Sequence, residues 1–294
     1  MPYLLQHRPQ PVIRAAIAVL SLALLAGCQS MDTTTRGAIG PERIAALLAS
    51  PDRAAADRTN DIRRKPAEML AFIGVRPGMV ALDVSAGGGY TSELLARAIG
   101  PGGRVYGQNP PRDTSASAPR PAAPEGGVVT APPPARPASG AGTSVTPPAR
   151  QTLTDRARNT GIAQLVPVTR RFDDPVPPEI APGTLDLATL MFNYHDLGYM
   201  GVDRAAMNKA VFNALKPGGI YVVADHSGRR GTGISEAGTL HRIEEAFLRA
   251  EVEAAGFKLA ASGNFLRNPA DPRDRNTPEP LQPKDEFVLK FLKP

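Results

Sequence analysis

The apolar positions of the chain follow two periods, one typical of buried strands and one typical of amphipathic helices. Apolar runs of strand length, about four to eight residues, recur between stretches with the i, i+3, i+4 spacing of helices. Glycine and proline stand at many boundaries; Gly100, for example, follows a helical stretch. The predicted strands lie within 79–84, 104–109, 162–168, 185–192, 220–225, 257–262 and 285–292, and the predicted helices within 41–50, 51–74, 92–100, 153–161, 204–215 and 241–256.

The order of these elements predicts the fold class. Residues 79–109 form a strand, a helix and a second strand within about 30 residues, and a crossover of this length joins parallel strands. The same alternation continues to residue 256. The chain is therefore predicted to be an α/β protein with helices packed on a mostly parallel sheet.

Residues 110–150 interrupt the alternation. They contain 11 prolines among 41 residues and no aromatic residue, Leu, Ile or Met. Such a segment buries too little apolar surface to offset the entropy lost on ordering. We expect a disordered insertion within one domain that spans residues 41–294.

The net charge by itself excludes few classes of function. The chain of 294 residues carries a formal charge of +6, but it has no long run of Lys or Arg, no Trp and only 5% aromatic residues. A nucleic-acid partner is therefore not expected.

The first residues have the pattern of an export signal. Arg8 and Arg14 precede an apolar run over residues 15–25, which is too short to span a bilayer as a helix. The run ends at Leu25-Ala26-Gly27-Cys28, which resembles a bacterial lipobox, and Cys28 is the single cysteine of the chain. We expect residues 1–27 to be a signal peptide, Cys28 to be lipidated and residues 28–40 to be a tether, so that the protein faces the periplasm, most simply on the outer membrane. A start at Met31 would instead leave it in the cytoplasm.

The glycines that follow the first predicted strand indicate a ligand loop. The segment reads Asp83-Val84-Ser85-Ala86-Gly87-Gly88-Gly89, and ligands of open parallel sheets bind beyond the carboxyl ends of the strands. Tyr90-Thr91 stands where a P-loop needs Lys-Ser/Thr, which argues against that loop. A dinucleotide fingerprint matches in part, because Ser92 occupies the third glycine position.

A third interpretation accounts for more of the chain. The segment from Asp83 to Gly89 resembles motif I of class I S-adenosylmethionine-dependent methyltransferases, and Lys216-Pro217-Gly218-Gly219 before the fifth strand is also similar to that family. The resemblance implies a three-layer α/β/α fold with a seven-stranded, mostly parallel sheet and a C-terminal antiparallel hairpin. It also implies S-adenosylmethionine as the cofactor. The residues it assigns to the cofactor are Asp83, Ser85, Gly87, Gly89, Asn109, which stands where the family has an acidic residue facing the ribose, and Asp174 near the adenine.

Methyl transfer to a hydroxyl or an amine requires a group that removes a proton, and histidine suits this task. His195 and His226 end the fourth and fifth predicted strands, and each has a carboxylate neighbour, Asp196 and Asp225. These four residues are the candidate catalytic groups. Tyr194, His241 and Arg242 are candidate substrate contacts, although an i, i+4 surface pair of His241 with Glu245 explains His241 equally well. No metal site is expected, since no fixed ligand spacing such as H-E-x-x-H occurs.

The leading hypothesis is therefore methyl transfer from S-adenosylmethionine to an unidentified small molecule. An exported, non-catalytic lipoprotein that keeps the fold is the alternative, because this cofactor is made in the cytosol. A NAD-dependent oxidoreductase is a third and weaker alternative. The sequence predicts no oligomeric state.

Overall fold

The computed structural model describes residues 37–111, 152–278 and 281–294. The predicted signal peptide, the predicted lipidation site Cys28, most of the predicted tether and residues 112–150 of the predicted insertion lie outside the described residues. In the part of the chain that is described, no helix combines the length and hydrophobicity needed to cross a membrane.

Seven strands form one sheet in the order β3-β2-β1-β4-β5-β7-β6. Neighbouring strands from β3 to β5 are parallel, and β7 pairs antiparallel with both β5 and β6. The predicted mostly parallel sheet with an antiparallel C-terminal hairpin is thereby confirmed. The strands are β1 (Val80–Val84), β2 (Arg104–Asn109), β3 (Leu165–Thr169), β4 (Leu185–Met191), β5 (Leu215–His226), β6 (Lys258–Gly263) and β7 (Glu286–Leu292).

Helices connect these strands, and several begin or end at the residues that their sequences indicate. The Asp203 side chain accepts a hydrogen bond from the Ala206 N–H and caps α7, while Gly74 ends α3 in the left-handed conformation. Local sequence therefore sets many of the boundaries. The helices are α1 (Pro41–Ala49), α2 (Ala55–Arg64), α3 (Pro66–Ile73), α4 (Tyr90–Ile99), α5 (Leu153–Thr160), α6 (Tyr194–Tyr199), α7 (Arg204–Ala214), α8 (Ala237–Leu240) and α9 (Glu245–Ala254).

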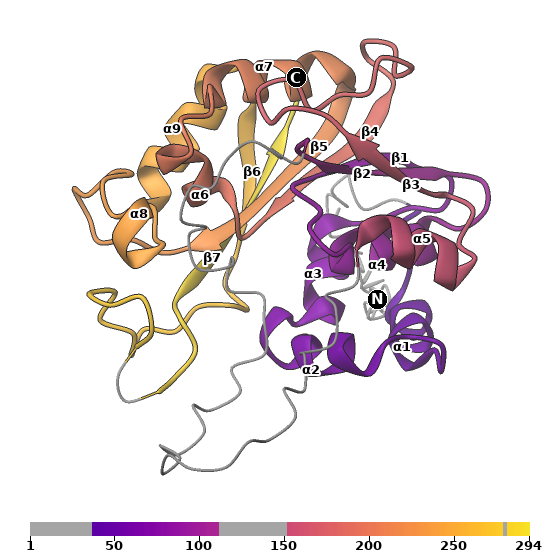
Figure 1. Cartoon of the computed structure of the whole chain (residues 1–294), viewed down its shortest axis with the longest axis horizontal. Coiled ribbons are helices and arrows are strands. Elements are labelled where there is room, and N and C mark those ends of the chain that lie inside the picture. The colour runs from indigo at the N-terminus through magenta and orange to yellow at the C-terminus, as the bar shows by residue number, and fades with distance from the viewer. Residues whose placement is uncertain (1–36, 112–151, 279–280) are drawn as a thin grey trace, which may run out of the picture.

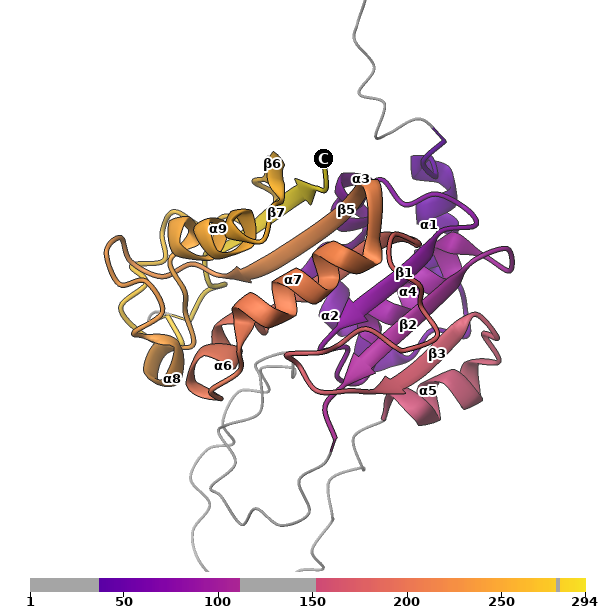
Figure 2. The ribbon, with the colours of Figure 1, turned by 90° about the horizontal axis from the view of Figure 1, so that it is seen from above.

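The helices cover both faces of the sheet and complete three layers (Figures 1 and 2). Successive strand residues point to opposite faces, so Ala81 joins the core beneath α1, α3 and α4, whereas Leu82 joins the core beneath α6, α7 and α9. The strands that flank the predicted insertion, β2 and β3, pair directly with each other. The sheet therefore continues across this position in the sequence.

The structure differs from the sequence-based expectation after β4 and before α9. The chain turns into the short helix α6 directly after β4, so His195 lies in the first turn of a helix and not at the end of a strand. The last predicted helix begins at Glu245, because His241 adopts the left-handed conformation with φ of 50°. The predicted i, i+4 geometry of His241 and Glu245 is therefore absent, and Glu245 pairs with Arg267.

Candidate functional site

The glycine loop joins β1 to α4 at the carboxyl edge of the sheet. Ser85, Gly87 and Gly89 all have positive φ, at 58°, 56° and 85°. A Cβ added to Gly87 would meet no atom within 4 Å, whereas one added to Gly89 would lie 2.5 Å from Cδ1 of Leu153. Gly87 therefore faces open space that a ligand could occupy, while Gly89 allows α5 to pack against the loop.

The end of β2 holds this loop in place. Asn109 exchanges two hydrogen bonds with Gly87: its Oδ1 accepts from the Gly87 N–H at 2.8 Å and its Nδ2 donates to the Gly87 carbonyl at 2.9 Å. The buried Gln108 accepts from the Ser85 N–H through Oε1 at 3.0 Å. Asn109 was predicted to face the ribose, and the structure gives it this loop contact. Gln108 was not predicted to contribute to the site. A polar residue within an otherwise buried strand was the sequence signal that could have indicated it.

Asp83 faces the protein interior. Its carboxylate accepts hydrogen bonds from the hydroxyls of Ser92 at 2.6 Å and Thr189 at 2.7 Å, and the residue is 2% exposed. Burial raises the pKa of Asp83 to about 6, even though both hydrogen bonds favour the charged form. Asp83 therefore ties β1 to α4 and β4 beneath the loop.

A hydrogen-bond chain links the loop to the second predicted part of the site. The Ser85 hydroxyl donates to Oδ1 of Asn193 at 2.6 Å, and Nδ2 of Asn193 donates to Oδ2 of Asp196 at 3.0 Å. Asn193 follows β4 and precedes α6, so the carboxyl ends of β1 and β4 meet through its side chain. Asn193 was not predicted, because one uncharged residue in a loop gives no distinctive signal in the sequence.

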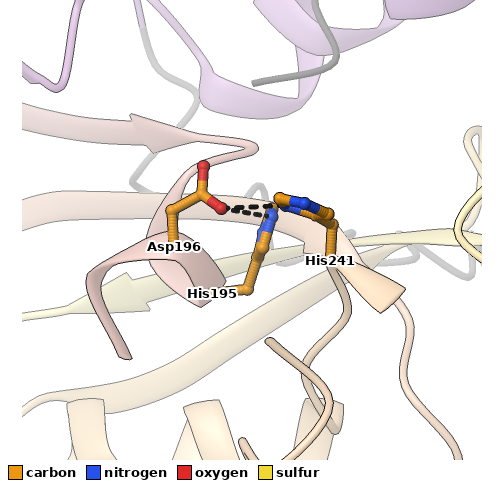
Figure 3. Close-up of side chains that lie close together, drawn as sticks. All are labelled: His195, Asp196 and His241. Atoms are coloured by element: carbon orange, nitrogen blue, oxygen red, sulfur yellow. Dashed lines mark hydrogen bonds and ion pairs between the residues drawn. The ribbon is translucent and has the colours of Figure 1, made fainter. Parts of the chain in front are cut away.

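Three residues form a compact group beside this link, which we call the histidine cluster: His195, Asp196 and His241. Oδ1 of Asp196 lies 3.0 Å from Nε2 of His195 and 3.1 Å from Nδ1 of His241 (Figure 3). The other ring nitrogen of His195 lies 2.6 Å from Oδ1 of Asp225, whose Oδ2 accepts from the His195 backbone N–H. The structure thus brings together four of the predicted site residues, across 46 positions of the chain.

The surrounding charges shift the protonation of this cluster. Burial by itself lowers the pKa of His195, but the negative charges of Asp225 and Asp196 outweigh it and raise that pKa to about 9. Burial acts to raise the pKa of Asp196, yet the hydrogen bond with His195 dominates and lowers it to about 2. The cluster therefore combines an ionised carboxylate with a positively charged imidazole.

His226 lies behind the cluster in a different environment. Its ring centre is 5.3 Å from that of His195, and its Nδ1 is 2.9 Å from Oε1 of Glu286, without the alignment of a hydrogen bond. Burial lowers the pKa of His226 well below its usual value, and nearby Lys284 acts in the same direction. His226 is therefore neutral near pH 7.

Three further predicted residues lie elsewhere. Tyr194 is buried in the core beneath α6, α7 and α9, where its hydroxyl donates to Glu251. Arg242 is fully buried and forms a bidentate pair with Asp271. Asp174 lies on the surface, where it pairs with Arg170. In the described structure, the side chains of Tyr194, Arg242 and Asp174 thus have contacts that separate them from the histidine cluster.

A pocket lies between α3, α4 and the end of β4. Its lining is mostly apolar and includes Tyr90 and Phe192. The Arg64 guanidinium lies over both rings, 5.1 Å from the Tyr90 centroid and 4.9 Å from that of Phe192. Burial lowers the pKa of Arg64 to about 10, so the group keeps its charge at neutral pH.

Comparison with known protein sequences gives one short match. No family model matches the chain. A segment of 38 residues is 55% identical to protein-L-isoaspartate O-methyltransferase of Aeropyrum pernix, which amounts to 13% of this chain and 15% of that protein. The chain thus spans a small part of the length of this relative.

Solved structures match most of the chain at low sequence identity. A chain in the complex of the Haloferax volcanii Trm112 methyltransferase activator is 17% identical, with a TM-score of 0.50 and coverage of 87% of this chain and 99% of that one. A SAM-dependent methyltransferase from Aquifex aeolicus is 14% identical, with a TM-score of 0.47 and coverage of 87% and 100%. Together with the observed strand order, the similarity confirms that this chain has the fold of class I S-adenosylmethionine-dependent methyltransferases.

Proposed function

We propose that this protein is an S-adenosylmethionine-dependent methyltransferase that acts on a small molecule. The observation that carries the proposal is the chain of hydrogen bonds from Ser85 through Asn193 to Asp196. It connects the glycine loop, which this fold uses for its cofactor, with a cluster of groups that can handle a proton. A loop and a polar cluster with unrelated tasks would not need such a connection.

The backbone of the glycine loop leaves room for the cofactor. Gly87 leaves open space at the position of a Cβ, and Asn109 fixes the peptide groups on both sides of Gly87. A ligand can therefore approach the backbone closely without a conformational change of the loop. When bound, S-adenosylmethionine supplies an electrophilic methyl group.

The histidine cluster supplies what the acceptor needs. Methyl transfer is an in-line displacement, so the protein must orient a nucleophile and, for a hydroxyl or an ammonium, accept its proton. Imidazole nitrogens and a carboxylate oxygen converge within the cluster, and Asp225 fixes the ring of His195 from behind. At neutral pH His195 already carries its second proton, so we expect it to orient the acceptor, and we expect the ionised carboxylate of Asp196 beside it to accept the proton. His226, held neutral behind them, would support the ring of His195.

The nearby pocket supports an acceptor that is in part apolar. Its lining is mostly hydrophobic and aromatic, as in sites that bind small molecules. Arg64 places a positive charge over its two aromatic rings. An acceptor that carries an acidic group beside an apolar body would match this lining.

The experiment for this proposal follows the methyl group. The purified chain is incubated with methyl-labelled S-adenosylmethionine and a cell extract freed of macromolecules, and the fractions are assayed for label. We expect label in a small molecule, and much less of it with Asn193→Ala, which breaks the link to Asp196. Cofactor binding without transfer to any fraction would instead favour the non-catalytic alternative.

We also propose that the protein is exported and lipidated on Cys28. The support is the lipobox with its preceding basic and apolar segments. Labelling of cells with palmitate tests this: the wild-type chain should incorporate label in a globomycin-sensitive manner, and Cys28→Ser should not. An unlabelled wild-type chain would favour the start at Met31.

A further inference from the structure

We propose that the histidine cluster is a binding site for one divalent transition-metal ion. The ligands are Nε2 of His195, Oδ1 of Asp196 and Nδ1 of His241, and the ion takes the place of the proton on Nε2 of His195, which is released to solvent. The sequence predicted no metal, because the three residues have no recognised spacing and His241 lies 45 positions after Asp196. The inference concerns ion binding alone and does not depend on methyl transfer.

The distances within the cluster are those of a ligand set. The three ligand atoms all lie within 4.8 Å of one another, and Oδ1 of Asp196 is 3.0 Å from the His195 nitrogen and 3.1 Å from the His241 nitrogen. Around an ion with bonds of about 2.1 Å, neighbouring ligand atoms are separated by about 3.0 to 3.4 Å. The two distances to Oδ1 of Asp196 therefore fall within the range for neighbouring ligands of one ion.

A second layer of contacts orients the ligands. Asp225 lies 2.6 Å from Nδ1 of His195, so the opposite ring nitrogen points at the cluster. Asn193 donates to Oδ2 of Asp196 and leaves Oδ1 directed at both imidazoles. Metal-binding histidines almost always have such a carboxylate or carbonyl partner on the second ring nitrogen, and their metal-binding carboxylates are themselves hydrogen-bonded.

The backbone at His241 supports the same conclusion. His241 has φ of 50°, a conformation that is costly for a residue with a Cβ and that tends to occur at functional sites. This conformation breaks the helical path before α9 and brings the ring to Asp196. The His241 side chain is 14% exposed, against 2% for His195 and 4% for Asp196, so an ion can enter on its side.

The donor set selects a class of ion. Two imidazoles and one carboxylate suit Zn²⁺, Mn²⁺ or Fe²⁺ better than Mg²⁺ or Ca²⁺, which prefer oxygen ligands. Asp196 and Asp225 supply two negative charges within the buried site, which match the charge of a divalent ion. Three protein ligands leave further coordination positions open, and an oxygen atom of the acceptor could occupy one of them.

Calorimetric titration of the untagged, metal-depleted protein with zinc chloride, in the absence of cofactor, tests the proposal. We expect one ion per chain for the wild type. Asp225→Asn should weaken binding by about 10- to 100-fold, since it removes the second-layer partner. His241→Asn should weaken binding further, because it removes a ligand while Asn tolerates the left-handed backbone. Asp52→Asn, at a carboxylate that is 56% exposed and pairs with Arg97 outside the cluster, should match the wild type.

Circular dichroism establishes that each variant is folded, and Co²⁺ gives a second readout. Co²⁺ bound at the cluster should produce visible absorption bands in the wild type and in Asp52→Asn, and these bands should be absent from His241→Asn. The proposal is overturned if the wild type binds no ion or if folded His241→Asn binds as tightly as the wild type. Since neither measurement involves S-adenosylmethionine, failure here leaves the proposed methyl transfer to its own test.

Discussion

Asn109 and Gly87 exchange two hydrogen bonds, one in each direction, between the end of β2 and the glycine loop. The family that the sequence resembles has an acidic residue at the position of Asn109. An acid can accept from the Gly87 N–H, but when ionised it cannot donate to the Gly87 carbonyl. The amide of Asn109 is therefore suited to both partners.

Asn109→Asp should consequently weaken S-adenosylmethionine binding, although it restores the charge typical of the family. The variant loses the hydrogen bond to the Gly87 carbonyl and places a negative charge beside it. We expect a loss of about 10-fold, the equivalent of one hydrogen bond of about 1.4 kcal/mol, measured by calorimetric titration. Tighter binding by the variant would show that the ribose contact matters more than the loop contact.

Gly87 and Gly89 both have positive φ, but their substitution by alanine should have different effects. Gly87→Ala adds a methyl group in the open space of the loop, so we expect a loss of cofactor affinity with a stability cost of about 1 kcal/mol from the positive φ. Gly89→Ala places its methyl group 2.5 Å from Leu153 and should lower the free energy of unfolding by more. Thermal melting and titration of both variants separate the two effects, and equal destabilisation would contradict this assignment.

Arg156 anchors α5 to the core through buried charges. Its guanidinium lies 2.5 Å from both Asp57 and Glu93, and its Nε donates to the Gly88 carbonyl. Arg156→Met leaves the two carboxylates without this partner, so the free energy of unfolding should fall by about 3 kcal/mol.

Arg158→Met is the matched control, because Arg158 is on the same helix but its side chain is 72% exposed. Its effect should stay below about 0.5 kcal/mol. Urea denaturation of both variants gives the comparison. Similar losses in the two would show that the buried pairs of Arg156 contribute no more than a surface contact.

Asp83 should make stability depend on pH. Its pKa rises from 3.8 to about 6 on folding, so the native state binds the proton more tightly than the unfolded state. The resulting stabilisation is complete below pH 4 and is lost as pH rises through 6. Relative to Asp83→Asn, the wild type should lose about 2 kcal/mol between pH 4 and pH 7. Denaturation at several pH values checks this, and a difference that is constant with pH would contradict it.

The fold could be predicted from the sequence because its signals are local. Strand-length apolar runs, the glycine at the end of a helix and the capping Asp203 each act within a few residues. Their order predicts parallel strands, since short crossovers join parallel strands, whereas the antiparallel C-terminal hairpin was implied by the family resemblance. The glycine loop could be located for the same reason, as it directly follows a strand.

The candidate site was harder to predict, because its key contacts span long separations. Asp196 and His241 meet only through an unusual backbone conformation at His241, which no neighbouring residue indicates. Arg242 then continues in a different direction and pairs with Asp271 in the interior. Tyr194 is a candidate substrate contact whose hydroxyl donates to Glu251, whereas the neighbouring His195 contacts Asp225. Such partners, 57 and 30 positions away, cannot be read from adjacency in the sequence.

Calorimetric titration of the chain from Gln29 onward with S-adenosylmethionine, S-adenosylhomocysteine and NAD tests the central claim most directly. The account predicts saturable binding of the first two at one site per chain, weakened by Gly87→Ala, and no comparable binding of NAD. An absence of heat with both sulfur compounds, from protein shown to be folded, would contradict the claim that the loop from Ser85 to Gly89 is a cofactor site.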